Sequence, residues 1–179
     1  MTSTAPRRVI YSVAASLDGY IADPAGDVGW IPEEPTIDWA GFVGRFDMAL
    51  MGRRTYEVAV RMSGDPGQAA PGGLPAIVFS RTLRPDDHPD VTVTRDDPAA
   101  VVARLRETPG KDIWLMGGGD LFRSFLEAKL VDVVEVAIAP VILGGGMALL
   151  PEGSAGGRLA LSRQQTYPSG IVLLTYEVL

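Results

Sequence analysis

The sequence contains no cysteine and only one histidine, His88. These absences exclude a disulfide framework, a thiolate or multi-histidine metal centre and a cysteine nucleophile, so any metal site would have to use carboxylates. No apolar run reaches the roughly 18 residues that a membrane span needs, and Ser12 and Ser16 break the apolar stretch near the N-terminus. We therefore expect a soluble, cytoplasmic protein without a metal ion and without a membrane partner.

Basic charge is scarce as well. The 16 lysine and arginine side chains stand against 22 acidic ones, which gives a net charge of −6. A general polyanion binder needs a basic face to neutralise phosphates, so nucleic acid is not an expected partner. The 179 residues are 46% hydrophobic and 21% charged, which excludes intrinsic disorder and suits one core. The sequence predicts a single domain over residues 1–179.

Strand-like and helix-like patterns alternate along most of the chain, and strands alone follow. Short apolar or β-branched runs predict strands at residues 9–15, 47–51, 76–80, 91–94, 112–116, 131–143, 159–166 and 171–178. Helical spacing and capping residues predict helices at residues 38–46, 53–61, 98–106 and 120–129, the first of them capped by Thr36. This order predicts an α/β fold, a three-layer αβα architecture with a mainly parallel mixed sheet and an antiparallel C-terminal hairpin.

Two stretches rich in proline and glycine interrupt this pattern. Residues 23–35 carry three prolines and two glycines, which is too many for a helix, and their length is typical of a lid or a substrate loop. Residues 63–75 are equally rich in these residues, but no second core follows that would need a linker. We interpret the second stretch as an internal loop.

Candidate binding residues follow the predicted strands. In open α/β sheets, ligands bind beyond the carboxyl ends of the parallel strands, which here precede residues 16–19, 52–55, 80–81 and 117–120. The glycines at 117–119 leave the backbone bare before a helix, so its amides and dipole could contact a diphosphate. Tight packing between the strand and the helix would require the same glycines, and the motif alone does not separate these two explanations.

Three arginines and two hydroxyl groups lie at two of these strand ends: Arg53, Arg54, Thr55, Ser80 and Arg81. Arginine guanidinium groups match phosphate oxygens in a bidentate way, so the cluster predicts a phosphate site. A solvated basic rim is the alternative, because 14 of the 16 basic residues are arginine.

Asp38 is the carboxylate whose sequence neighbours best suit a proton donor. It opens an apolar helix beside Trp39 and follows the loop that contains Trp30. A carboxyl group partly desolvated by such neighbours keeps its proton near neutral pH, as a proton donor requires. Alternatively, Asp38 is an acidic residue favoured by the helix dipole. We interpret Asp18 as a turn residue and His88 as a solvent-exposed loop residue.

The stretches VAASLDGYIA, GDVGW, MGRRTYE, IVFSR and DIWLMGGGDLFRSFL occur in this order along nearly the whole chain. Together they resemble the dihydrofolate reductase superfamily, and more closely its branch related to the riboflavin-biosynthesis reductase domain. The resemblance implies a stand-alone NADPH-dependent reductase domain. It also implies that the NADPH-binding residues are Ala15, Gly52, Arg53, Arg54, Thr55, Ser80, Arg81, Met116, Gly117, Gly118, Gly119, Asp120 and Leu121.

In that family the strand-end arginines hold the adenosine 2′-phosphate, and the glycine triplet holds the diphosphate and the nicotinamide side. The resemblance further implies that Trp30, Asp38 and Phe42 bind the substrate, with Asp38 as the catalytic acid. Leu74 stands where folate reductases carry an arginine for the folate glutamate, so we do not expect folate to be the substrate.

The leading hypothesis is an NADPH-dependent oxidoreductase that transfers hydride to a C=N or C=O bond of a small pterin- or pyrimidine-like molecule. The alternatives are a nucleotide- or pterin-binding protein without turnover, and a structural oligomerisation module. We also expect a homodimer, because residues 131–143 are apolar on both alternating faces. A central strand buried within the monomer would show the same pattern.

Overall fold

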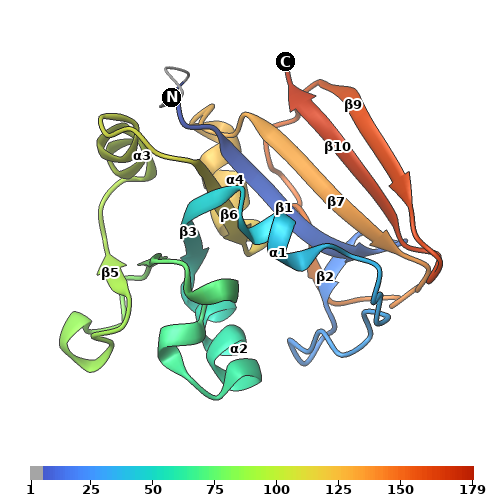
Figure 1. Ribbon diagram of the computed structural model, residues 1–179, viewed down its shortest axis with the longest axis horizontal. Coiled ribbons are helices and arrows are strands. Elements are labelled where there is room, and N and C mark those ends of the chain that lie inside the picture. Colours follow the sequence, from blue (N-terminus) through green and yellow to red (C-terminus); the bar gives the residue numbers. More distant parts are fainter. Residues whose placement is uncertain (1–5) are drawn as a thin grey trace.

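The computed structural model describes residues 6–179, and a mixed sheet of eight strands in the order β5-β4-β3-β6-β1-β7-β10-β9 forms its middle layer (Figure 1). The strands are β1 (Val9–Ser16), β3 (Phe46–Gly52), β4 (Ala76–Phe79), β5 (Thr92–Thr94), β6 (Asp112–Gly117), β7 (Val133–Ala139), β9 (Leu159–Thr166) and β10 (Val172–Val178). The first six in the sheet order pair in parallel, whereas β10 is antiparallel to both β7 and β9. The predicted parallel sheet and C-terminal hairpin are confirmed.

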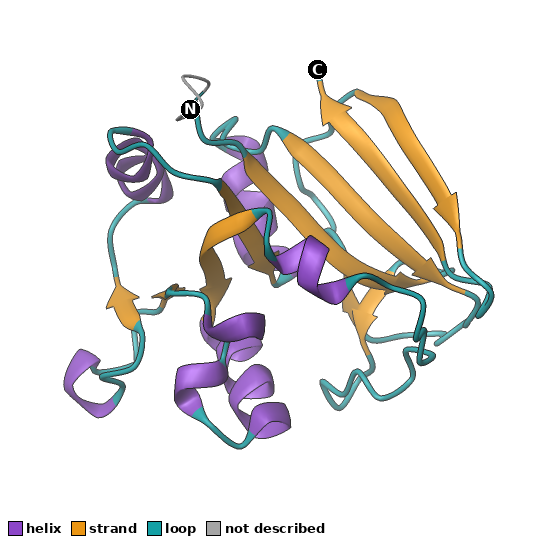
Figure 2. Cartoon of the chain, in the orientation of Figure 1, coloured by secondary structure: helices purple, strands orange, loops and turns teal. Residues whose placement is uncertain are grey.

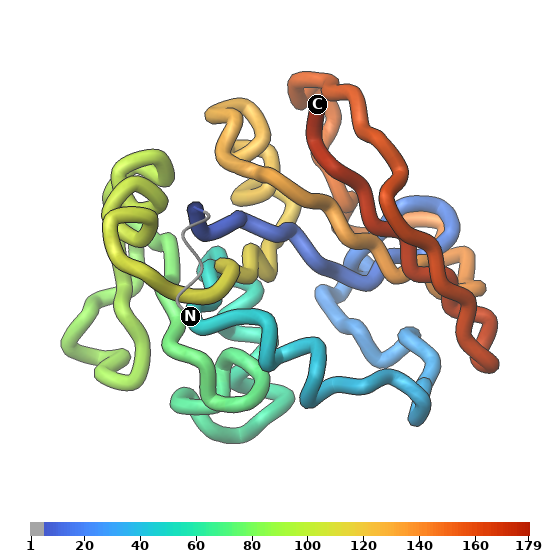
Figure 3. The backbone as a smooth tube through the Cα atoms, turned by 45° about the horizontal axis from the view of Figure 1, so that its top comes forward, coloured from blue at the N-terminus to red at the C-terminus, as the bar shows by residue number. Residues whose placement is uncertain are grey.

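Helices cover both faces of this sheet (Figure 2). They are α1 (Trp39–Val43), α2 (Arg53–Ser63), α3 (Pro98–Arg106) and α4 (Gly119–Glu127), with short 3₁₀ turns η1 (Pro66–Gln68), η2 (Pro71–Gly73) and η3 (Pro85–Asp87). Within the described residues, no helix is long and apolar enough to cross a membrane. Figure 3 shows the C-terminal hairpin at one end of the sheet and the β4–β5 region with α3 at the other.

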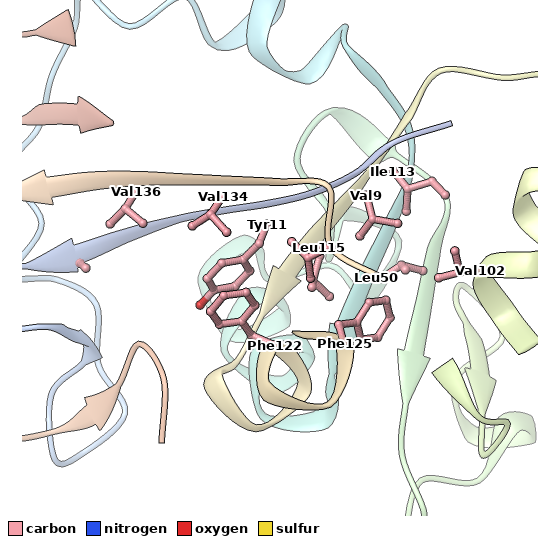
Figure 4. Close-up of a cluster of buried hydrophobic side chains, with 12 residues drawn as sticks. Val9, Tyr11, Leu50, Val102, Ile113, Leu115, Phe122, Phe125, Val134 and Val136 are labelled. Atoms are coloured by element: carbon pink, nitrogen blue, oxygen red, sulfur yellow. The ribbon is translucent and has the colours of Figure 1, made fainter. Parts of the chain in front are cut away.

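One face of the sheet packs against α3 and α4. Tyr11 of β1 and Leu115 of β6 belong to the same buried cluster as Phe122 and Phe125 of α4 (Figure 4). The rings of Tyr11 and Phe122 stack with their centroids 3.8 Å apart. Because residues three apart lie on one side of a helix, both phenylalanines of α4 face the sheet. This packing places the start of α4 at the carboxyl end of β6.

The opposite face packs against α1 and α2, because alternate strand residues point to opposite sides. Phe42 of α1 meets the rings of Trp114 and Phe46 at centroid distances of 5.0 and 5.3 Å. Tyr56 of α2 is buried against Met51 of β3. The two packed faces confirm the predicted three-layer architecture.

The structure corrects the first predicted helix. It begins at Trp39, one residue later than predicted, and has only five residues. Its N-cap is Asp38, whose Oδ1 accepts the N–H of Gly41 at 2.8 Å, and not Thr36. Phe46 belongs to β3 and not to the helix. Glycine is a weak helix former, so the glycines within and directly after this segment favour a short helix.

The long strand predicted at residues 131–143 is also too long. β7 ends at Ala139, because Pro140 has no N–H to continue the ladder. The N–H of Val141 turns back to the carbonyl of Ala139, and the Val141 carbonyl accepts the N–H of Leu17, each at 2.8 Å. A second small ladder of β2 (Tyr20–Ala22) and β8 (Met147–Ala148) was not predicted. The other predicted elements agree with the structure to within two residues at each end.

Candidate functional site

The turns that follow β3 and β6 lie against each other. Gly52 is the N-cap of α2 and Gly118 is the N-cap of α4, and neither helix receives a side-chain cap. A Cβ atom on Gly52 would lie 3.8 Å from the carbonyl oxygen of Gly117, and one on Gly118 would lie 3.6 Å from Oγ1 of Thr55. Two helix N-termini with bare backbone therefore converge, and their free amides and dipoles favour an anion at this place.

Gly119 is the first residue of α4, and the backbone of the segment after β8 lies directly against it. A Cβ atom on Gly119 would lie 2.6 Å from the carbonyl oxygen of Ala148 and 3.2 Å from that of Leu149. These distances are too short for any side chain, so glycine is required where the segment after β8 crosses the helix start. Packing therefore requires Gly119, as one of the two explanations predicted, whereas the contact of the triplet with a diphosphate stays a prediction.

The strand register brings the predicted arginines to one edge. Gly52 pairs with Phe79 in the β3–β4 ladder, so the residues that follow these strands start side by side. Arg53 and Arg54 follow β3, and Arg81 follows β4. Arg53 is held by Glu57 at 2.8 Å, whereas Arg54 and Arg81 are exposed to solvent. The guanidinium groups of Arg54 and Arg81 are therefore exposed at this rim, while that of Arg53 is engaged by Glu57.

A further arginine at this edge was missed. Arg95 directly follows β5 and is exposed. The N–H of Ser80 donates to the carbonyl oxygen of Thr94 at 3.0 Å, so the ends of β4 and β5 are joined next to Arg95. The rule that selected Arg81, a basic residue directly after a parallel strand, would also have selected Arg95.

The hydroxyl of Ser80 already has partners. It accepts the N–H groups of Thr82 and Leu83 at 3.1 and 3.0 Å, which shapes the turn that carries Arg81. The hydroxyl proton itself stays available as a donor, because a hydroxyl both donates and accepts. Ser80 therefore has a structural role in this turn, and its contact with a cofactor stays a prediction.

The other predicted cofactor residues differ in accessibility. Ala15 is buried and belongs to the core cluster under α4, so only its backbone can meet a ligand. Met116 points to the opposite face, where it packs against the cluster of Phe46 and Trp114. Leu121 and Asp120 lie in the first turn of α4, the former half-buried and the latter exposed.

Asp38 is exposed, and its neighbours do not shield it as expected. Trp39 is 57% exposed, and Nε1 of Trp30 donates to the carbonyl of Asp27 at 3.2 Å within the preceding loop. Phe42 points to the sheet, as its contacts with the core rings require. The predicted exclusion of water around Asp38 is absent from this structure, where its carboxylate caps α1.

Small side chains line the sheet beside α1, a feature that the sequence analysis missed. Ser12 and Ala14 of β1 and Ala137 of β7 are only half-buried, although they lie in central strands. Ala14 and Ala137 are direct neighbours in the ladder. Small residues at alternate positions of both strands were the available signal, and they leave the sheet surface accessible to a flat ligand.

An open groove of about 430 Å³ lies on the outer side of α1, between this helix and η2. Its lining residues carry no charged side chain: Trp39, Ala40, Val43, Gly44, Pro71 and Gly72. Leu74 is half-buried nearby and packs against two core clusters. The groove therefore offers no cation for an anionic substrate tail.

Asp18 has the turn role expected for it and a second contact. Its carboxylate accepts the N–H groups of Leu143 and Gly144 at 3.1 and 2.7 Å. The side chain of Ser16 and then these amides lower the pKa of Asp18 to about 2. Asp18 thus joins the end of β1 to the glycine-rich turn after β7.

His88 is not the solvent-exposed loop residue that was expected. It is half-buried, and its Nδ1 lies 3.0 Å from the hydroxyl oxygen of Tyr56. Burial, and secondarily the charge of Asp90, raise the pKa of Tyr56 above its usual value. This contact fastens the loop after η3 to α2.

Comparisons with known proteins extend this description. The family model of the RibD C-terminal domain matches residues 7–173. The uncharacterised protein YyaP of Bacillus subtilis (strain 168) is 31% identical over an alignment of 179 positions, which covers 96% of this chain and 95% of YyaP. The crystal structure of a putative riboflavin biosynthesis protein from Shewanella sp. PV-4 is similar with a TM-score of 0.81, at 25% identity over 96% of this chain and 99% of that one.

The dihydrofolate reductase fold is also shared. Dihydrofolate reductase from Enterococcus faecalis, complexed with NADP(H) and RAB-propyl, is similar with a TM-score of 0.68 at 15% identity, and 96% of each chain is covered. The resemblance inferred from the sequence motifs is confirmed, because the family model spans nearly the whole chain. The chain belongs to the RibD C-terminal domain family.

Proposed function

We propose that the protein is an NADPH-dependent reductase that transfers hydride to a C=N or C=O bond of a small pterin- or pyrimidine-like molecule. Members of its fold include reductases, and the E. faecalis enzyme is complexed with NADP(H). The observation that carries the proposal is the convergence of the uncapped starts of α2 and α4 at Gly52 and Gly118, beside strand-end arginines. Such a place suits the diphosphate of a dinucleotide.

The residues present fit NADPH. The amides at the starts of α2 and α4 and the hydroxyl of Thr55 would hold the diphosphate, since the bare glycines leave room for a close approach. Arg54, Arg81 and Arg95 would hold the 2′-phosphate through charge-assisted hydrogen bonds. Bound there, the nicotinamide cofactor supplies the hydride. The protein orients both reactants and controls the proton.

Asp38 would supply that proton or bind the amino-pyrimidine edge of the substrate. The carboxylate is exposed in this structure, so the substrate itself and the loop at residues 23–35 would have to exclude water from it. The presence of Leu74, where folate reductases carry an arginine, supports a substrate without an anionic tail. We therefore expect poor turnover of dihydrofolate.

We further propose a homodimer. The apolar character of residues 131–143, from which a dimer was expected, supports it less than expected. Val133, Val134 and Val136 are buried within this chain, so β7 itself needs no partner. The C-terminal hairpin supports the proposal instead, since Leu159 and Leu161 are exposed on edge strand β9. Light scattering at micromolar concentration should give twice 19.0 kDa, and a particle of 19.0 kDa would end this proposal.

The experiment for the activity measures NADPH oxidation with a panel of pterins and pyrimidines, together with titration of NADPH and NADH. Oxidation that depends on one of these heterocycles is the expected result. Tight NADPH binding without turnover on any of them would favour the alternative, a nucleotide-binding protein of the same fold. Absence of NADPH binding would overturn the proposal.

A further inference from the structure

Glu34 connects the loop before α1 to the C-terminal hairpin. It is only 7% exposed, although it belongs to a loop. Its Oε1 accepts the N–H and the hydroxyl of Thr36 at 3.0 and 2.5 Å, and its Oε2 accepts the N–H of Ser169 at 2.8 Å. Ser169 lies in the turn between β9 and β10, so this side chain joins parts of the chain that are 135 residues apart.

A second glutamate holds the chain just after α1. Arg45 donates from Nη2 to Oε1 of Glu135 at 2.9 Å and from Nη1 to Oε2 at 3.2 Å, a bidentate ion pair. Glu135 lies on β7 and is 4% exposed. The guanidinium group of Arg45 also stacks over the rings of Phe42 and Phe46, at 5.6 and 5.1 Å from their centroids.

Residues 34–45, which we call the α1 segment, are therefore anchored at both ends to the half of the sheet formed by β7 and the hairpin. Between these anchors lie Asp38, the residue proposed to meet the substrate, and Phe42, which packs on the rings of Phe46 and Trp114. α1 has five residues and none of them is fully buried, so the helix is too short to hold its own position. The two glutamates, together with the packing of Phe42 on Phe46 and Trp114, consequently decide where Asp38 lies.

The two anchors differ in kind. The Arg45–Glu135 pair is bidentate, largely buried on its carboxylate side and packed on two aromatic rings. Glu34 holds its distant partner through the backbone N–H of Ser169, in a surface turn that also contains Pro168. Loss of Glu34 would therefore free one end of the α1 segment while the other stays in place.

We propose that Glu34 is a positioning residue of the proposed reductase, which holds the start of α1 and its cap Asp38 in place by binding the backbone of Ser169. The inference rests on the function proposed above, because that function gives Asp38 its role toward the substrate. Glu34 acts through the α1 segment and not on the substrate.

The anchor persists across the pH range of an enzyme assay. The hydroxyl of Thr36, and next the amide of Ser169, lower the pKa of Glu34 to about 2. The carboxylate is thus ionised from pH 5 to 8, and any effect of its removal should be the same throughout that range.

The first test needs no turnover. Hydrogen exchange is followed in peptides that cover the α1 segment, in the wild type, in Glu34→Ala and in Glu33→Ala. Glu33 is the adjacent, exposed glutamate and serves as the matched control. We expect exchange in Glu34→Ala to be faster by roughly tenfold, because one anchor of the segment is lost and local opening becomes easier. Exchange equal to that of the wild type would overturn the inference.

The second test separates positioning from folding, with the panel substrate that the wild type reduces. In Glu34→Ala the KM for this substrate should rise by roughly tenfold or kcat should fall by as much, since small misplacements of positioning groups are costly. The NADPH dissociation constant should stay unchanged, because its proposed ligands follow β3 to β6. Thr36→Val, which loses the hydroxyl contact but keeps the Ser169 contact, should stay close to the wild type.

The outcomes distinguish the two proposals. Failure of the wild type to oxidise NADPH with any heterocycle would contradict the proposed function, while the exchange experiment still decides whether Glu34 orders the segment. Wild-type KM and kcat in Glu34→Ala, despite faster exchange, would leave Glu34 a structural residue only and overturn its role in positioning. If Glu34→Ala does not fold, Glu34→Gln, whose Oε1 can still accept from Ser169, replaces it with smaller expected changes.

Discussion

The ion pair between Arg45 and Glu135 allows a quantitative prediction of the stability lost in single variants, because its two partners differ in exposure. The side chain of Arg45 is 38% exposed, whereas that of Glu135 is 5% exposed. Arg45→Ala removes both donors from a carboxylate that is buried in the folded protein. Glu135→Gln leaves the guanidinium group of Arg45 without a charged partner, but water already reaches that group. The amide oxygen of the new side chain still accepts one hydrogen bond from Arg45. Loss of the arginine should therefore destabilise the protein more than loss of the glutamate charge.

The magnitudes follow from this asymmetry. Breaking a buried pair from one side costs about 3–5 kcal/mol, and the partial exposure of Arg45 places Arg45→Ala near the lower end, about 3 kcal/mol. A hydrogen bond to a charged group contributes about 1.5–3 kcal/mol, and the water that already reaches Arg45 lowers this value, so Glu135→Gln, which loses one such bond and keeps one, should cost about 1–2 kcal/mol. For a chain of this size, these losses correspond to a Tm lower by about 6–12 °C and about 2–8 °C, respectively.

Urea unfolding of both single variants and of the double variant measures these values. The double variant should lose less stability than the sum of the single changes by more than about 0.5 kcal/mol, because the two residues share one interaction. Arg45→Lys is the matched control, since it keeps the charge but not the bidentate contact. Equal losses in Arg45→Ala and Glu135→Gln, or additive losses in the double variant, would refute the reasoning.

Three further predictions concern the site. Arg54→Ala and Arg81→Ala should each weaken NADPH binding by roughly tenfold and leave NADH binding unchanged, because only NADPH carries the 2′-phosphate; parallel loss of both affinities in titrations would contradict this. Asp38→Asn should keep NADPH binding and lower turnover by roughly 10² to 10⁴, the effect of a lost general acid. Full turnover from pH 5 to 8 would reduce Asp38 to a helix cap. The lowered pKa of Asp18, about 2 against 3.8, means that its contribution to stability is complete above about pH 4 and disappears as the pH falls toward about 2. Acid unfolding should therefore be less steep in Asp18→Asn over that interval, and an identical profile would argue against the contacts with Leu143 and Gly144.

Local signals in the sequence were sufficient for most elements. The hairpin strand at Leu159–Thr166 and the helix at Pro98–Arg106 have the predicted bounds, the latter capped by Asp97. In both cases the alternation or the cap is encoded by residues close together in the chain. The same holds for the arginines, because a residue directly after a parallel strand lies at the carboxyl edge whatever the order of the strands.

Other features depend on partners far away in the chain, and only the tertiary structure decided them. Nothing near Asp38 in the sequence shows that its flanking aromatics leave it exposed, since Phe42 turns to Trp114 instead. The contact of Glu34 with Ser169 and that of Arg45 with Glu135 join residues 135 and 90 positions apart.

The physical reason is the range over which each kind of interaction acts. Backbone preference, capping and periodicity operate within about one turn of helix or one strand, so the sequence by itself determined most of the elements, their alternation and the residue types at the strand ends. The order of the strands, the meeting of the Gly52 and Gly118 turns and the two glutamate anchors arise only when burial of apolar faces brings distant segments together. Tertiary packing therefore decided where Asp38 lies, whereas the sequence alone was enough to select it as a candidate residue.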